Sequence, residues 1–145
     1  MALIVTFAGE YDLACKDALR QDLSFAVDHD VAILDFSDVT YVDSSSLAEL
    51  VLLARRRIEL RFEPALLVLP AGCVKRTIET VHVDALFAVF PTLADAVEAR
   101  GGRYERRIAR RGGVDLEAGD VNYGGSAGTM HPWRAGMISP FTNYR

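Results

Sequence analysis

The feature that most constrains the fold is an alternation of short apolar runs and amphipathic segments over the first hundred residues. Four runs rich in apolar and β-branched residues are typical of strands, at residues 3–7, 31–36, 65–69 and 86–90. Helical patterns follow them, at residues 13–27, 44–58, 74–81 and 92–100. This alternation predicts a largely parallel sheet with connecting helices, which is the α/β class.

The clearest amphipathic helix lies after the second run. Its apolar positions recur with helical spacing at Leu47, Leu50, Val51, Ala54 and Ile58. Three arginines at positions 55–57 crowd its last turn, where the helix dipole favours cations. We interpret these arginines as a solvated helix end, with contact to an acidic patch on a partner as the alternative.

The composition changes near residue 100. Residues 1–100 carry a formal charge of −7, whereas residues 101–145 carry +3 and nine of the eleven glycines. The second segment has few aliphatic residues with which to form a core. We therefore expect one domain over residues 1–100 and a flexible or loosely docked tail over residues 101–145. The tail has a basic cluster of five arginines, at positions Arg103, Arg106, Arg107, Arg110 and Arg111. A solvated extension is the simpler interpretation of this cluster, and contact with nucleic acid or a membrane surface is a minor alternative.

Composition also excludes several classes. The net charge of −4 argues against a protein that binds nucleic acid directly with its whole surface. No apolar stretch approaches the length that spans a bilayer, so no membrane segment is predicted. Cys15 and Cys73 lie far apart, without the spacing of a zinc site or a disulfide framework. We expect a cytoplasmic protein without a metal or a cofactor.

The densest polar cluster is Asp43-Ser44-Ser45-Ser46, between the second strand and the clearest helix. The simplest interpretation is helix capping, because Ser46 and Glu49 match a capping box. Three serines after an aspartate exceed what one helix end requires. A serine here lies at the carboxyl end of a strand, where α/β sheets meet ligands and partners. Since a phosphate adds about −1.5 to −2 charges, the cluster also fits a phosphorylation switch.

Three segments in register resemble STAS-domain anti-sigma factor antagonists. Residues 31–45, VAILDFSDVTYVDSS, resemble the segment that carries the family's phosphorylated serine. Residues 7–12, FAGEYD, resemble its G-E-x-D turn, and residues 84–96, DALFAVFPTLADA, resemble its last strand and helix. The resemblance covers about residues 2–100 and implies a STAS-like mixed sheet of four to five strands with alternating helices.

The resemblance implies a regulatory binding protein and not an enzyme. In the family, the unphosphorylated antagonist binds an anti-sigma factor that is also a serine kinase, and so frees a sigma factor. Phosphorylation of the antagonist ends this interaction, and a PP2C-type phosphatase resets it. Carried over, the phospho-acceptor is Ser44, with Ser45 and Ser46 as less favoured sites. The partner-binding residues that the resemblance implies are Gly9, Asp12, Asp43, Ser44, Ser45 and Leu47.

The sequence departs from the family in three places. Ser46 stands where the family usually has glycine, two residues after the phosphorylated serine. The family commonly begins with an additional strand, whereas this chain opens on what looks like the second one. Residues 3–7 are then expected to form an exposed edge at which a homodimer could pair. The tail after residue 100 has no counterpart in the small members.

Two alternative functions remain open at this point. The same domain serves elsewhere as a non-switching interaction subunit of a phospholipid-transport ABC complex or of a stress-signalling scaffold. A hydrolase would use Ser44 as nucleophile with His29, His82 or His131, but the sequence has no G-x-S-x-G elbow.

Overall fold

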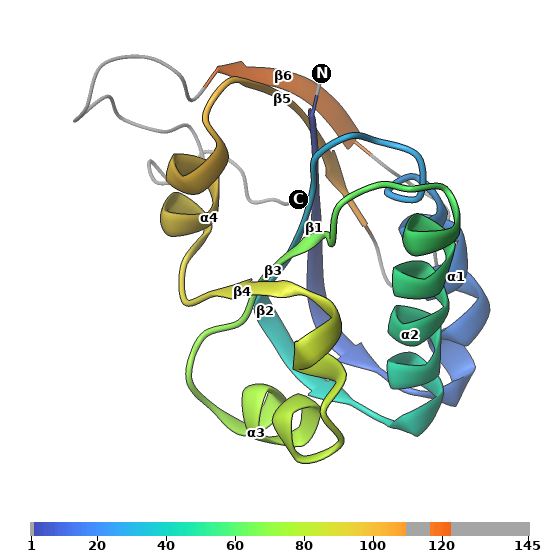
Figure 1. Ribbon diagram of the computed structural model, residues 1–145. Helices are drawn as coiled ribbons and strands as arrows, with labels where there is room; N and C mark the ends of the chain where they lie inside the picture. The colour runs from blue at the N-terminus through green and yellow to red at the C-terminus, as the bar shows by residue number, and fades with distance from the viewer. Residues whose placement is uncertain (1, 110–116, 123–145) are drawn as a thin grey trace.

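The computed structural model describes residues 2–109 and 117–122, the last six as backbone only (Figure 1). The first half of the chain forms β1 (Ala2–Tyr11), the 3₁₀ helix η1 (Leu13–Cys15), α1 (Lys16–Ser24), β2 (Ala32–Val42) and α2 (Ser44–Glu59). The second half forms β3 (Leu66–Val68), α3 (Cys73–Thr80), the 3₁₀ helix η2 (Val83–Leu86), β4 (Ala88–Phe90), α4 (Leu93–Arg100), β5 (Arg103–Ile108) and β6 (Glu117–Asn122).

The strands form one six-stranded sheet in the order β4-β3-β2-β1-β5-β6. The first five strands in this order pair in parallel, and β6 pairs antiparallel to β5. The predicted α/β class and mixed sheet with alternating helices are thus confirmed, and the sheet has six strands where four to five were predicted. The longest strands, β1 and β2, lie at the centre, so their carboxyl ends emerge next to each other.

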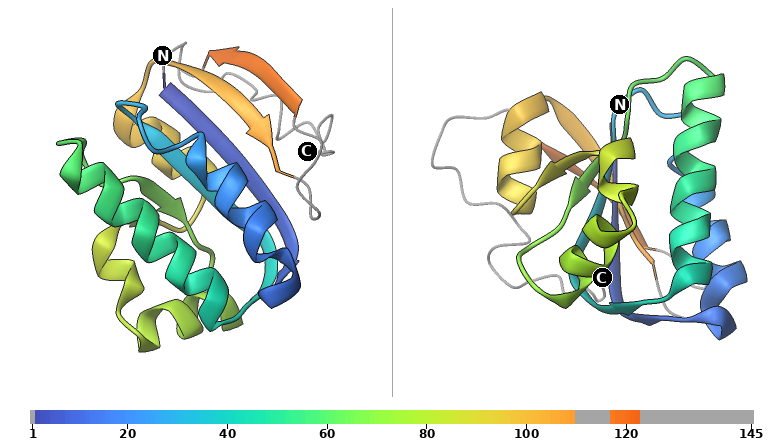
Figure 2. Two further views of the ribbon diagram at one scale, coloured as in Figure 1. Left: turned by 90° about the vertical axis from the view of Figure 1, so that its right-hand side faces the viewer. Right: turned by 60° about the horizontal axis from the view of Figure 1, so that its bottom comes forward.

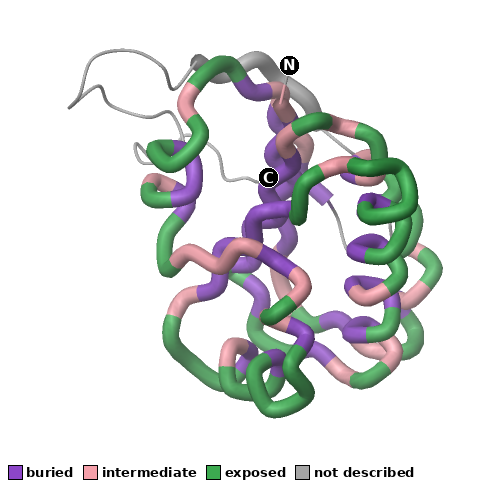
Figure 3. Tube along the Cα trace, in the orientation of Figure 1, coloured by how far each residue is buried: buried purple, intermediate pink, exposed green. Residues whose placement is uncertain are grey.

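The helices cover the two faces of the sheet unequally (Figure 2). The main core lies on the face that packs against α1, α2 and α3, and β1 contributes Leu3, Val5 and Phe7 to it. Ile4 points to the opposite face, into a smaller core with Leu93 of α4. Because successive side chains of a strand alternate, a strand buried on both faces is apolar throughout. Figure 3 shows this burial along the central strands and on the inner sides of the helices.

Residues 103–108 differ from the prediction. Composition predicted a tail here, but these residues form β5, which pairs with β1 from Ala2↔Tyr104 to Thr6↔Ile108. Tyr104 and Ile108 are buried, and the Arg107 guanidinium lies 4.2 Å from the Phe25 ring centroid. Averaging the composition over 45 residues concealed this strand, whose sequence RYERRI has only two apolar residues, Tyr104 and Ile108. The remainder of the predicted tail, residues 110–116 and 123–145, lies outside the described residues.

The predicted exposed edge at residues 3–7 is also wrong. β1 lies between β2 and β5, and the exposed fraction of Leu3, Ile4 and Val5 is 0%. β5 thus occupies the side of β1 that was predicted to be an open edge. This strand therefore offers no backbone edge to a second copy of the chain.

Arg57 corrects the interpretation of the three arginines as solvated. Its side chain is 1% exposed and donates hydrogen bonds to the carbonyl oxygens of Ala26 and His29, both at 2.7 Å, and of Glu63 at 3.0 Å. The Phe62 ring lies 5.4 Å from the guanidinium carbon. Arg57 therefore holds the connection between α1 and β2 against the end of α2.

Candidate functional site at the start of helix α2

The candidate site lies where the carboxyl ends of β1 and β2 meet the start of α2 (Figure 1). Tyr11 and Val42 are register partners at the ends of these two strands. η1 follows β1 after one residue, and α2 follows β2 after one residue. This is the edge of a parallel sheet at which α/β proteins commonly place ligands and partners.

Asp43 caps α2. Its backbone is extended, and its Oδ1 accepts hydrogen bonds from the Ser45 hydroxyl at 2.6 Å and the Ser46 amide at 3.0 Å. The hydrogen bond from the Ser45 hydroxyl is the main cause that lowers the pKa of the Asp43 carboxyl below its ordinary value. Asp43 therefore carries a full negative charge beside Ser44 at neutral pH.

Ser46 connects the two strand ends. Its side chain is 1% exposed, and its hydroxyl donates to the Tyr11 carbonyl oxygen at 2.8 Å. The same carbonyl accepts the Asp43 amide at 3.2 Å. The end of β1 and the start of α2 are thus joined through one carbonyl group. With glycine at position 46, the Tyr11 carbonyl would keep only the hydrogen bond from the Asp43 amide.

The three serines differ in accessibility. Ser44 is exposed, and within the described part of the chain its hydroxyl forms no hydrogen bond. The Ser45 hydroxyl is half-buried and held by Asp43, and the Ser46 hydroxyl is buried and held by Tyr11. Only Ser44 combines an exposed position with a free hydroxyl in this cluster.

Gly9 and Asp12 shape the neighbouring loop. Gly9 has a φ of +89°, a left-handed conformation that favours glycine, at a register shift between β1 and β2. Asp12 caps η1 by accepting the Ala14 amide at 3.0 Å. Among the described residues no hydrogen bond or ion pair joins Asp12 to Ser44. β1 continues to Tyr11, so Gly9 lies within the strand and not in a turn after it.

Leu47, one of the predicted partner-binding residues, is buried, whereas two exposed residues nearby were not predicted. Leu47 is 8% exposed and packs in the main core, so it supports α2 from below and offers little surface to a partner. By contrast, Leu13 is 69% exposed directly after Asp12, and Tyr41 is 50% exposed two residues before Asp43. The signal for Tyr41 was available, because Val42 points inward and strand neighbours alternate.

The described residues do not bring Ser44 together with His29 or His82 as a hydrolase would require. His29 precedes β2 and Ser44 follows it. The eleven residues of β2 place the two ends of this strand about 33 Å apart, at 3.3 Å per residue. No hydrogen bond links Ser44 to His82 in residues 2–109, and His131 lies outside the described residues. Over the same residues, no cluster of three metal-ligating side chains occurs, and none of the helices has the length and hydropathy to cross a membrane.

Comparisons with known proteins agree with this arrangement. An anti-sigma factor antagonist from Mycobacterium paratuberculosis has a similar structure, with 25% identity and a TM-score of 0.58, over 66% of this chain and 84% of that chain. The anti-sigma factor antagonist SpoIIAA in its unphosphorylated form has 17% identity and a TM-score of 0.53, over 68% and 87%. The Bacillus cell fate determinant SpoIIAA in its phosphorylated form has 16% identity and a TM-score of 0.52, over 68% and 89%.

A search of curated protein sequences found no match. At 17% and 16% identity, the likeness to the two SpoIIAA structures shows a shared fold alone. The sequence pattern of the STAS domain matches residues 1–96, which is well over half of the chain. The chain therefore belongs to the STAS domain family.

Proposed function

We propose that this chain is an anti-sigma factor antagonist that binds an anti-sigma factor with serine kinase activity and is released by phosphorylation at Ser44. The chain then acts as a cytoplasmic regulatory binding protein and not as an enzyme. A PP2C-type phosphatase returns it to the binding form. The similar protein from Mycobacterium paratuberculosis, which is named an anti-sigma factor antagonist, supports this role.

The observation that carries the proposal is the difference between the three serines. A kinase needs a hydroxyl that is accessible and not already engaged. Ser44 meets both conditions, whereas the hydroxyls of Ser45 and Ser46 are held by Asp43 and Tyr11. Those two bonds also fix the start of α2, so Ser44 is presented in one defined position.

The electrostatics fit a switch that changes the surface and leaves the fold intact. A phosphate on Ser44 adds about −1.5 to −2 charges at the first position of α2, where the helix dipole stabilises an anion. The helix therefore keeps its place. A partner surface that fits the neutral hydroxyl next to ionised Asp43 meets a much larger negative charge, and its complex is destabilised.

The surface around Ser44 also supplies apolar contact area. Leu13 and Tyr41 are the large exposed apolar side chains next to the two strand ends. Aromatic and aliphatic residues in the centre of an interface often contribute most of its binding free energy. We assign the partner contact to Leu13, Tyr41 and Ser44. Asp12 and Asp43, which precede Leu13 and Ser44 in the sequence, flank this contact.

The experiment is an affinity capture from native lysate with four baits, followed by mass spectrometry of the eluates. The wild-type chain and Ser44→Ala are expected to recover an ATP-binding serine kinase, and Ser44→Asp is expected to lose it. Gln21→Glu is the matched control, because it adds one negative charge to an exposed position of α1. The control should recover the kinase as the wild type does.

Binding constants then give the size of the effect. We expect Ser44→Asp to weaken the purified complex by about a hundredfold, which corresponds to about 2.8 kcal/mol. If Ser44→Asp and Ser44→Ala bind alike, the switch is wrong. Recovery of transport or scaffold subunits, equally with every bait, would instead assign the chain to a fixed interaction module in which Ser44 is only part of a helix start.

A further inference from the structure

A second surface lies between α1 and α2, away from Ser44. It is a groove of about 240 Å³ whose walls are the apolar side chains of Leu23, Val27, Leu52 and Leu53. Figure 2 shows the two helices side by side on the same face of the sheet. Leu52 is 47% exposed, although its neighbours Leu23 and Leu53 are buried. The groove therefore presents apolar surface that the described fold does not cover.

Glu49 and Arg20 close one end of the groove. Arg20 donates two parallel hydrogen bonds to the Glu49 carboxylate, both at 2.9 Å, and the Glu49 side chain is 3% exposed. This pair is bidentate, which is the strong geometry for arginine and carboxylate. The negative charge of Glu49 is thus compensated within the wall and repels no ligand.

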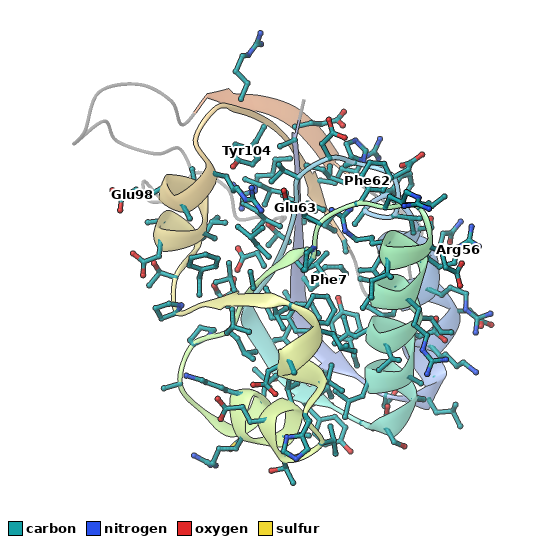
Figure 4. All side chains as sticks on the ribbon, in the orientation of Figure 1. Phe7, Arg56, Phe62, Glu63, Glu98 and Tyr104 are labelled. Atoms are coloured by element: carbon teal, nitrogen blue, oxygen red, sulfur yellow. The ribbon has the colours of Figure 1, made fainter. Side chains whose placement is uncertain are left out.

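Arg56 lies at the groove with its charge available. Its side chain is 61% exposed, and its ion pair with Glu59 is long, at 3.5 Å, and exposed on both sides. Figure 4 shows Arg56 on the outer side of α2. With Glu49 neutralised by Arg20, the charged residues of the lining leave a net positive charge, in a chain whose net charge is −4. The groove is complementary to an apolar ligand with acidic flanks.

The size of the groove indicates the class of ligand. Pockets for drug-sized molecules hold about 300–1,000 Å³, so this groove suits inserted side chains better than a whole small molecule. Amphipathic helices bind in this way, with apolar residues at i, i+3, i+4 and i+7 in a groove between helices. We propose that the α1–α2 groove binds an acidic amphipathic helix of a partner protein, with aliphatic side chains against Leu52 and a carboxylate against Arg56.

This groove is independent of the Ser44 switch. Leu52 and Arg56 lie about 12 and 18 Å along α2 from Ser44, at 1.5 Å per residue. Both distances exceed the Debye length of about 8 Å at physiological ionic strength. A negative charge at position 44 should therefore leave binding in the groove unchanged.

The test is an NMR titration of the full ¹⁵N-labelled chain with two helical peptides of sixteen residues. Both peptides have leucine at positions i, i+3, i+4 and i+7, which face the groove. One peptide carries glutamate at all other positions, and the other carries lysine there. We expect the glutamate peptide to bind with a dissociation constant below about 1 mM and to shift the amide resonances of Leu23, Val27 and Leu52. The lysine peptide should bind at least tenfold more weakly.

Variants separate this site from others on α2. Leu52→Glu should weaken the glutamate peptide at least tenfold. Ile58→Glu makes the same change on the same helix at a 63% exposed residue outside the groove, and should change binding less than twofold. Arg56→Glu should reverse the preference between the peptides, and Ser44→Asp should have no effect.

Four results would overturn the proposal. They are equal binding of both peptides, absence of shifts in the groove, equal effects of Leu52→Glu and Ile58→Glu, and displacement of the glutamate peptide by a peptide of residues 123–145. Self-association of the chain that Leu52→Glu abolishes would assign the groove to a second copy instead. Failure here leaves the Ser44 switch intact, and loss of that switch leaves the groove intact.

Discussion

The Ser46 hydroxyl donates a hydrogen bond to the Tyr11 carbonyl oxygen at 2.8 Å, across 35 residues of sequence. Tyr11 ends β1, and Ser46 lies in the first turn of α2. The bond therefore couples the loop that holds Asp12 to the helix start that holds Ser44. It makes Ser46 a structural member of the site and leaves Ser44 as the accessible hydroxyl.

Replacing Ser46 by alanine should destabilise the fold. The variant removes a buried hydrogen bond and leaves the Tyr11 carbonyl with the Asp43 amide alone, which costs about 1–2 kcal/mol. Urea unfolding at equilibrium measures this difference in the free energy of unfolding. Ser44→Ala is the matched control and should change it by less than about 0.5 kcal/mol, because the Ser44 side chain is exposed. Equal effects of the two variants would contradict the coupling.

Asp22 predicts a pH dependence of stability. Its side chain is 0% exposed, neither carboxylate oxygen has a hydrogen-bond partner among residues 2–109, and burial raises its pKa to about 7. In the unfolded chain the carboxyl ionises near pH 3.9, so the folded state binds the extra proton between about pH 4 and pH 7. Stability should fall as pH rises through this window, by up to about 1.4 kcal/mol per pH unit from this group, and then level off.

Asp22→Asn isolates this contribution from the other carboxyl groups. The wild type should lose more stability than the variant between pH 5 and pH 7, which urea unfolding at both values measures. Parallel changes in the two proteins would show that Asp22 does not titrate in this range.

Arg57 should be the most sensitive of the three consecutive arginines. Arg57→Met leaves the carbonyl groups of Ala26, His29 and Glu63 without the guanidinium donor, and the Ala26 hydrogen bond is fully buried, so we expect a cost of about 3 kcal/mol. Arg56→Met alters an exposed side chain and should cost less than about 0.5 kcal/mol. Thermal unfolding of the two variants measures the contrast, and similar midpoints would contradict the assigned role of Arg57.

β5 sets the boundary of the domain. A chain that ends at Arg100 leaves β1 without β5, one of its two partner strands, and exposes the backbone edge of residues 2–6, so it should aggregate or unfold. A chain that ends at Asn122 retains both β5 and β6 and should unfold cooperatively. Size-exclusion chromatography and urea unfolding distinguish the two. A stable monomer that ends at Arg100 would restore the boundary expected from composition.

The elements that could be predicted are those with a local signal. β2 and α2 were found from an apolar run and a helical period. The capping box predicted at Ser46 and Glu49 is wrong, because Asp43 caps α2 and the Glu49 carboxylate pairs with Arg20. The same helical period predicted Ile58 as buried, yet Ile58 is 63% exposed, because Arg57 and not Ile58 faces inward in the last turn of α2. A search for apolar residues at helical spacing passes over a buried arginine.

The missed features depend on contacts between distant segments. Arg57 is buried because carbonyl groups from two connections converge on it, and β5 forms by pairing with β1, about a hundred residues earlier in the chain. The distinction between Ser44, Ser45 and Ser46 arises in the same way, since Tyr11 comes from another strand. Neither composition nor spacing contains these relationships.

The most direct test of the central claim is phosphopeptide mapping of the chain isolated from its own cells. The account predicts phosphate on Ser44, with Ser45 and Ser46 unmodified, and loss of this phosphate after treatment with a PP2C-type phosphatase. Phosphate on Ser45 or Ser46 with Ser44 unmodified would contradict the assignment. Two results together would contradict the switch itself. They are absence of phosphate from the chain under every growth condition, and equal binding of the partner by the wild type and the Ser44→Asp variant.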